Sequence, residues 1–171
     1  AVLKTDEVRK SLATELTLAG ERLNRVIENL LDMSRLNSGM LALKKEWHDV
    51  HDLISAAMNR ISQNRDRQRI RLNVPYDLPL VEMDFRLLQH AISNVVYNAI
   101  AHAQGDSEIC LTASVSGRKL LIVVDDNGPG IPEESIPMLF DKFYRVPGAP
   151  TGGTGLGLSI VKSIVEFHAG S

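Results

Sequence analysis

The sequence has little cysteine, no long apolar run and no excess of positive charge, and each of these absences excludes a class of protein. It has a single cysteine, Cys110, among 171 residues, which excludes an internal disulfide framework and fits a reducing compartment. Its longest purely aliphatic run is 120–124, far short of the roughly 20 apolar residues of a membrane span, and no basic segment followed by an apolar stretch opens the chain. The 19 Lys and Arg against 21 Asp and Glu leave no cationic excess for coating nucleic acid. These absences predict a soluble, intracellular, globular protein.

The first forty residues form a segment of their own, with no proline and with glycine only at Gly20 and Gly39. They predict one long amphipathic helix that ends at Ser38-Gly39. Its apolar positions alternate by four and three residues, as in a coiled-coil seam. They are Leu12, Leu16, Ala19, Leu23, Val26, Leu30 and Met33, widened by Ile27, Leu31 and Leu36. A stripe of this length favours partner helices in a bundle; the alternative is a helix that lies on the domain behind it.

The remainder of the chain alternates between short strands and helices, which predicts one layered α/β domain. Asp49 opens one predicted helix, and Asp84 is placed to cap another. The predicted strands are 41–47, 70–74, 108–116 and 119–125, and the predicted helices are 49–63, 85–102 and 156–168.

The predicted helix over 85–102 carries a polar row. His90, Asn94, Asn98 and His102 are each four residues apart and so project from one face. Because asparagine is a middling helix former, two in register suggest a ligand: an amide oxygen can coordinate Mg²⁺ while its NH₂ group reaches a phosphate. The alternative is a solvated helix face without charge. Structural zinc is excluded because the closed Cys and His spacings are missing.

Two glycine-rich loops and a segment between them follow. Asp126, with Gly128 and Gly130, is suited to accept a hydrogen bond from the adenine amine, although these residues could also form only a turn. The loop 151–159 opens the last helix, where backbone N–H groups and the helix dipole form an anion site. It matches neither a Walker A loop nor a Rossmann loop. Between the loops, residues 140–145 interleave aromatic and cationic side chains, as in a mobile flap or an irregular surface loop.

The order of these four motifs resembles the N, G1, F and G2 boxes of the ATP-binding domain of sensor histidine kinases, in the wider family that includes gyrase, Hsp90 and MutL. The resemblance implies an α+β fold, a two-layer α/β sandwich of the Bergerat type with a mixed sheet and three main helices, preceded by one long amphipathic helix. Residues 1–39 would be the second helix of the dimerisation and phosphotransfer hairpin. Residues 40–171 would be the catalytic domain without its last strands. The stretch 45–48 is similar to the potassium-responsive, turgor-sensing kinases.

The resemblance implies ATP and Mg²⁺ as cofactors. Asn98 would ligate Mg²⁺, Asn94 would support the phosphates, His102 would flank the nucleotide and Asp126 would bind the adenine amine. The other implied ATP-binding residues are Gly128, Gly130, Tyr144, Arg145, Gly153, Thr154, Gly155, Leu156, Gly157 and Leu158. Ala101 departs from the pattern, because many relatives carry Lys or Arg at that place, and the flap is short.

No histidine of the chain stands in the His-Glu/Asp-x-x-Thr/Asn-Pro context of a phosphoacceptor, so no catalytic residue is expected here. The resemblance implies a fragment of a longer kinase: a homodimer through the hairpin, a response regulator receiver domain as partner, no nucleic acid, and a parent protein held at the bacterial inner membrane by segments outside this cytoplasmic piece. The alternatives are an anti-sigma-type serine kinase and a non-catalytic dimerisation or docking module with a vestigial nucleotide site. A gyrase-type hydrolase is disfavoured because Asn94 stands where that group has glutamate.

Overall fold

The computed structural model describes residues 2–37, 42–61, 70–102, 108–117, 119–149 and 153–171. The chain divides into two compact units, Ala1–Met40 and Leu41–Ser171, and each is considered by itself. Within the described ranges, no helix has both the length and the apolar character needed to cross a membrane.

The first unit is one helix, α1 (Val2–Asn37), as the heptad spacing predicts. The predicted stop at Ser38-Gly39 lies outside the described residues. Along the predicted stripe, Leu12, Leu16 and Leu23 are exposed, with Leu16 at 73%. Apolar side chains that stay in water on a long helix identify a surface available for association.

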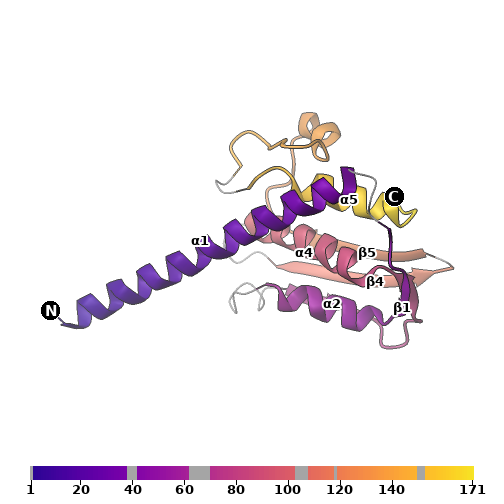
Figure 1. The fold of residues 1–171 in the computed structure, drawn as a ribbon, viewed down its shortest axis with the longest axis horizontal. Coiled ribbons are helices and arrows are strands. Elements are labelled where there is room, and N and C mark those ends of the chain that lie inside the picture. Colours follow the sequence, from indigo (N-terminus) through magenta and orange to yellow (C-terminus); the bar gives the residue numbers. More distant parts are fainter. Residues whose placement is uncertain (1, 38–41, 62–69, 103–107, 118, 150–152) are drawn as a thin grey trace. The chain divides into compact units, whose positions relative to one another are not determined.

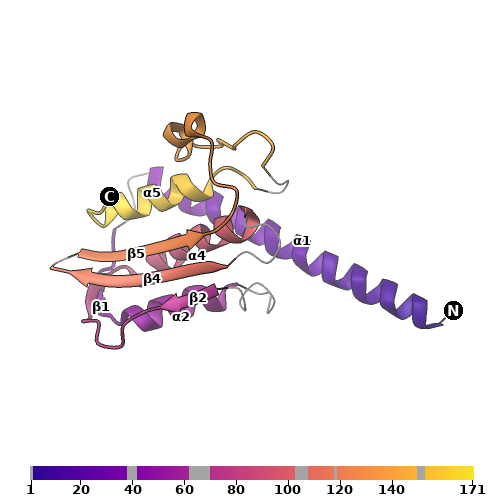
Figure 2. The ribbon, with the colours of Figure 1, turned by 180° about the vertical axis from the view of Figure 1, so that it is seen from behind.

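The second unit is a two-layer sandwich, which confirms the predicted α+β fold class (Figures 1 and 2). Helices α2 (Val50–Asn59), α4 (Phe85–His102) and α5 (Gly157–Phe167) are seen in front in Figure 1, and the strands are seen in front in Figure 2. The main sheet is mixed: β2 (Ile70–Asn73) runs parallel to β4 (Ile109–Ser116), which pairs antiparallel with β5 (Lys119–Asp126). A separate antiparallel pair joins β1 (Glu46–His48) to β3 (Val81–Met83).

The core lies between α2, α4 and the inner face of the sheet. Alternate residues of β4, namely Ile109, Leu111 and Ala113, are buried, as the period of two in a half-buried strand requires. From α2, Val50 and Leu53 fill the facing layer. This packing fixes α4 against β5 and so sets the position of its polar row.

Several predicted boundaries differ from the structure. Helix α2 ends at Asn59 rather than continuing toward Gln63, although Ile61 beyond it is buried. Strand β1 begins only at Glu46, later than predicted. Strand β2 ends at Asn73, one residue before its predicted end, and its Leu72 is 50% exposed.

The structure also contains an element that the sequence did not predict. A 3-10 helix, η1 (Glu133–Met138), begins after Pro132 and follows the glycine loop at the end of β5. It belongs to the segment drawn in orange in Figure 1, which leads from β5 to α5.

Candidate functional site

The polar row of α4 passes from the interior to the surface. His90 and Asn94 are buried, with Asn94 only 6% exposed, whereas Asn98 and His102 one and two turns later are half-buried. The alternative of a solvated helix face is therefore wrong for the first half of the row. A buried amide on a helix that packs against another helix is a group with a defined position.

Asn94 lies beside the first turn of α5. A Cβ built on Gly157 would stand 3.7 Å from Asn94 Oδ1, which is an ordinary contact distance. The backbone of α5 therefore begins next to the amide of α4, and the first N–H groups of a helix have no intrahelical partners. The structure brings together an amide side chain and a helix N-terminus that the sequence placed about sixty residues apart.

The flap is attached to the second glycine loop through Gly155. The Phe143 N–H donates to the Gly155 carbonyl oxygen at 3.0 Å. Gly155 has φ +71°. A Cβ there would stand 2.6 Å from the Phe143 carbonyl carbon and 2.6 Å from the backbone carbonyl oxygen of Tyr144. Only glycine fits this position, both for its backbone conformation and for its space.

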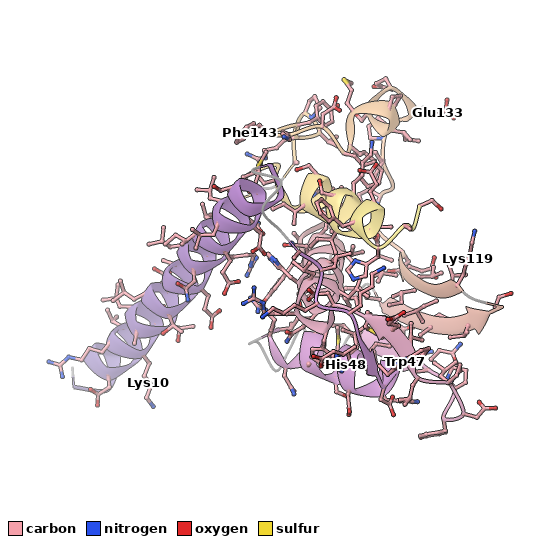
Figure 3. The ribbon with its side chains drawn as sticks, turned by 45° about the vertical axis from the view of Figure 1, so that its right-hand side comes forward. Lys10, Trp47, His48, Lys119, Glu133 and Phe143 are labelled. Carbon is pink, nitrogen blue, oxygen red and sulfur yellow. The ribbon has the colours of Figure 1, made fainter. Side chains whose placement is uncertain are left out.

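Two further bonds hold the flap, one to η1 and one to the residues that follow the flap. The Tyr144 hydroxyl donates to Ser135 Oγ at 3.0 Å, and Ser135 is buried in η1. Arg145 donates to the Ala149 carbonyl oxygen at 3.4 Å. Phe143 is 65% exposed at a positive φ of 66°, and Figure 3 shows its ring at the outside of this segment. The prediction of a segment anchored by aromatic residues is therefore right for Tyr144, whereas Phe143 is fixed through its backbone.

The loop after β5 is turned back on itself. Asp126, the last residue of β5, accepts a hydrogen bond from the Gly128 N–H at 2.9 Å through Oδ1. Gly130 lies in the left-handed region with φ +74°. The turn that the sequence left open as an alternative is therefore present. It holds the exposed Asp126 carboxylate at the end of the strand.

The remaining predicted residues lie along the second glycine loop. Thr154 Oγ1 accepts from the Leu156 N–H at 3.4 Å, and Leu156 is buried immediately before α5. A Cβ on Gly153 would be 4.0 Å from Arg145 Nε, so this loop runs next to the flap cation. Leu158 is half-buried in the first turn of α5. The contacts thus join α4, the second glycine loop and the flap, while Asp126, Gly128 and Gly130 form their own turn.

Two residues with specific contacts were missed by the sequence reasoning. Ser135 Oγ accepts a hydrogen bond from the Tyr144 hydroxyl. His168 Nε2 accepts one from the backbone N–H of Asp84, the N-cap residue of α4. Nothing in the local sequence marks Ser135. For His168 the sequence predicts only the end of a helix, since its partner stands 84 residues earlier.

Comparison with known proteins gives the family. The profile of the "Histidine kinase-, DNA gyrase B-, and HSP90-like ATPase" family matches residues 83–171. The chain is 36% identical over 148 residues to sensor protein KdpD of Escherichia coli (strain K12), covering 86% of this chain and 16% of that protein. It is 34% identical over 151 residues to the alginate biosynthesis sensor protein KinB of Pseudomonas aeruginosa, covering 87% of this chain and 25% of that protein. The chain therefore spans a quarter or less of these relatives.

Solved structures agree with these relatives. The mycobacterial sensor histidine kinase MprB superposes with a TM-score of 0.61 at 30% identity, over 74% of this chain and 82% of that one. Full-length ShkA, solved in complex with AMPPNP, superposes with a TM-score of 0.71 at 26% identity, over 92% of this chain and 33% of that one. The chain belongs to the histidine kinase-, DNA gyrase B- and HSP90-like ATPase family, and its relatives within that family are sensor histidine kinases.

Proposed function

We propose that the chain is the ATP-binding catalytic part of a two-component sensor histidine kinase and that it binds Mg-ATP between α4 and the second glycine loop. The observation that supports this most directly is the contact of Gly157 with Asn94, which places an amide beside the N-terminus of α5. Helix N-termini bind phosphates because their N–H groups are unpaired and the helix dipole is positive there.

The other residues fit roles around that point. Asn98 lies one turn beyond Asn94 and is half-buried, so its amide oxygen is available to a cation next to the phosphates. The part of the chain that the structure describes holds no cluster of three His, Cys, Asp or Glu side chains that could bind a metal. Mg²⁺ typically keeps several waters and binds through substrate phosphates with few protein ligands, so one amide ligand from the protein would suffice. Bound there, Mg²⁺ would neutralise charge on the triphosphate.

The adenine end is assigned to the loop after β5. The Asp126 carboxylate is held by the Gly128 N–H, and the absence of side chains at Gly128 and Gly130 leaves the backbone open to a flat ring. A carboxylate oriented by its own backbone is a suitable acceptor for an exocyclic amine. The flap, fixed to Gly155 through Phe143, would border the phosphates with Arg145.

In the intact kinase, the bound nucleotide would donate its γ-phosphoryl group to a histidine outside this chain. A nitrogen–phosphorus bond forms on the imidazole while the bond from phosphorus to the bridging oxygen breaks and ADP leaves. The chemistry depends chiefly on positioning and charge stabilisation, which is what amides and helix N–H groups supply. The phosphoryl group would then pass to an aspartate of a response regulator.

The exposed stripe of α1 supports a proposed homodimer. A partner helix would bury the exposed side chains of Leu12, Leu16 and Leu23. A second copy of the dimerisation hairpin to which α1 would belong could provide that helix. The parent protein would be attached to the inner membrane through segments outside this sequence.

A non-catalytic docking module with a vestigial nucleotide site is the second candidate, because Ala101, exposed on α4, departs from the cationic residue that the family resemblance implies there. An anti-sigma-type serine kinase is disfavoured by the long heptad helix α1.

Isothermal calorimetry with ADP and Mg²⁺ tests nucleotide binding, and a saturable heat that AMPPNP competes away is expected. No heat and no competition would refute the proposal. Labelled ATP, added with a separate hairpin segment that bears an acceptor histidine, then distinguishes the candidates. Label on histidine is expected for the kinase, and binding without transfer for the docking module.

A further inference from the structure

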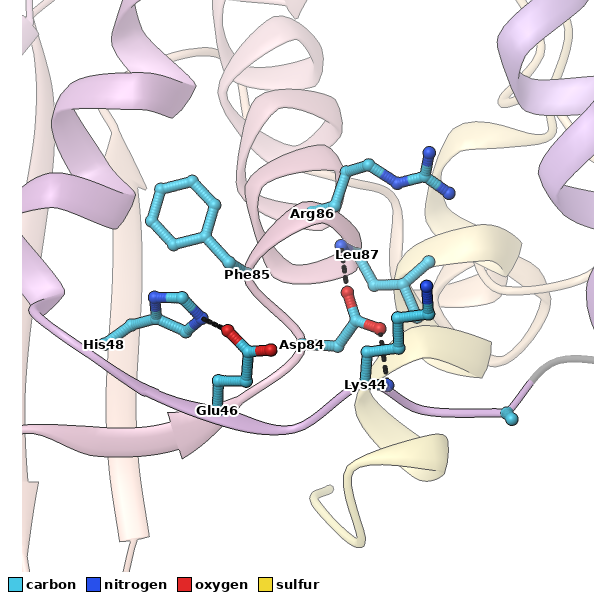
Figure 4. Close-up of a pocket in the computed structure, with 8 residues that line it drawn as sticks. Lys44, Glu46, His48, Asp84, Phe85, Arg86 and Leu87 are labelled. Atoms are coloured by element: carbon cyan, nitrogen blue, oxygen red, sulfur yellow. Dashed lines mark hydrogen bonds and ion pairs between the residues drawn. The ribbon is translucent and has the colours of Figure 1, made fainter.

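Asp84 connects three parts of the second unit. Its Oδ1 accepts from the Leu87 N–H at 3.1 Å and so caps α4, and its Oδ2 accepts from the Lys44 N–H at 3.0 Å (Figure 4). Its backbone N–H donates to His168 Nε2 at 3.0 Å. The first bond is the cap that the sequence predicts; the other two reach segments 40 and 84 residues away.

His168 is held in place by the way α5 ends. The Ala169 N–H donates to the Glu166 carbonyl oxygen and the Gly170 N–H to the Val165 carbonyl oxygen, each at 2.9 Å, and Ala169 has φ +59°. These two bonds form a Schellman motif with His168 at the C-cap. The motif fixes the backbone from which the imidazole reaches the cap of α4.

The two contacts of the ring determine which nitrogen carries the proton. A backbone N–H can only donate, so Nε2 accepts from Asp84. Nδ1 lies 2.8 Å from the Ile164 carbonyl oxygen, which can only accept, so Nδ1 carries the hydrogen. His168 is therefore a neutral imidazole that bridges the last turn of α5 and Asp84, the N-cap residue of α4.

This bridge stands opposite the nucleotide end of the same helix pair. Helices α4 and α5 run antiparallel, because Gly157 lies beside Asn94 whereas His168 lies beside Asp84. Asp84 and Asn94 are about 15 Å apart along α4, and Gly157 and His168 about 16 Å apart along α5, from the rise of 1.5 Å per residue. The two spans match, so the position of His168 along α4 determines where α5 begins relative to Asn94.

Packing and a hydrogen bond act together on this register. Ile160 and Ile164 of α5 are buried, and close packing of such side chains sets the distance to the neighbouring elements and resists sliding along the helix axis. The hydrogen bond from Asp84 to His168 is directional and is lost within a shift of a fraction of one residue.

We infer that His168 is a positioning residue for the nucleotide site: by accepting the Asp84 N–H, it fixes the axial register of α5 and so holds the first turn of α5 next to Asn94. The inference rests on the proposed function, since it concerns the geometry of the proposed phosphate site. His168 does not touch the nucleotide and acts only through α5.

The test compares variants of His168 in the whole chain. His168→Phe keeps the ring but removes both nitrogens, whereas His168→Gln retains an oxygen at about the position of Nε2. His168→Asn has too short a side chain to reach Asp84 and replaces the Phe variant if that protein fails to fold. His51→Phe is the matched control, because His51 makes a comparable ring-to-carbonyl bond, to Pro75 at 2.9 Å, on α2. The readouts are Mg-ADP affinity and hydrogen exchange at the Ile160 amide, which bonds to the Leu156 carbonyl in the first turn of α5.

His168→Phe is expected to weaken Mg-ADP binding about 3- to 10-fold, the equivalent of one hydrogen bond, and to speed exchange at Ile160. His168→Gln is expected to restore both to within about 2-fold, and His51→Phe to change neither. Unchanged affinity in His168→Phe, or an equal loss in the Gln variant, would overturn the inference. Faster exchange confined to the last turn of α5 would also overturn it. If the unaltered chain does not bind Mg-ADP, the proposed function fails, and the exchange at Ile160 still decides whether His168 holds the first turn of α5.

Discussion

Replacing Gly155 by alanine should detach the flap from the second glycine loop. Gly155 has φ +71°, where an L side chain costs roughly 1 to 2 kcal/mol. The new Cβ would stand 2.6 Å from the Phe143 carbonyl carbon, so that the flap backbone has to retreat by about 0.8 Å to reach an ordinary contact of 3.4 Å. Overpacking of this kind adds about 1 to 3 kcal/mol, which gives about 2 to 5 kcal/mol in total. Because local opening of the flap relieves the clash, the loss should appear first in the flap and in nucleotide affinity.

Calorimetry with Mg-ADP and hydrogen exchange of Gly155→Ala measure the effects on nucleotide affinity and on the flap. We expect binding at least about 10-fold weaker, together with loss of hydrogen-exchange protection at the Phe143 amide, which bonds to the Gly155 carbonyl. One control separates the causes. Gly148→Ala has a positive φ of 80° with open space around it. Wild-type affinity and protection in Gly155→Ala, or an equal effect in Gly148→Ala, would refute the argument from close contact.

Three further outcomes are expected. Asp126→Asn should weaken ADP binding by about 1 to 3 kcal/mol, because an amide matches the adenine amine less well than the carboxylate does; equal affinity by calorimetry would remove Asp126 from the site. Ala169→Gly should raise the free energy of unfolding in urea by about 0.5 to 1 kcal/mol, since glycine relieves the left-handed strain at φ +59°, and a decrease would contradict this. Leu16→Glu should lower self-association of the chain in sedimentation equilibrium, because Leu16 is 73% exposed on the stripe of α1; an unchanged association constant would show that the stripe is not the interface.

The parts of the structure that follow from local rules were predictable from the sequence. The heptad spacing predicts α1, and the Asp84 cap followed by a helical apolar pattern predicts α4, because both signals lie within a few residues of the element they determine. The spacing of Asn94 and Asn98 likewise predicts a shared face. Helix η1 follows from no comparable local signal, since Pro137 lies within it and would argue against a helix.

The contacts that depend on tertiary structure were not predictable. The Asp84 bond to His168 joins residues 84 apart, and Gly155 shows its role only when the backbone of Phe143 is seen against it. Burial of Asn94 follows from the packing of α4 against α5, which is why a polar row on a helix could be interpreted either as a ligand site or as a solvated face. The sequence therefore predicts candidate site residues, and the structure shows which of these candidates lie in contact.

The close approach of Gly155 to the flap also restricts how the chain can vary. Phe143 is itself at a positive φ, and its carbonyl fills the space that a side chain at position 155 would need. Position 143 therefore accepts glycine readily, whereas position 155 accepts a larger residue only if the peptide after 143 moves away. A flap exchanged between kinases of this family should consequently be transplanted together with the loop around Gly155, because a chimaera that takes only one of the two segments combines backbones that were not fitted to each other.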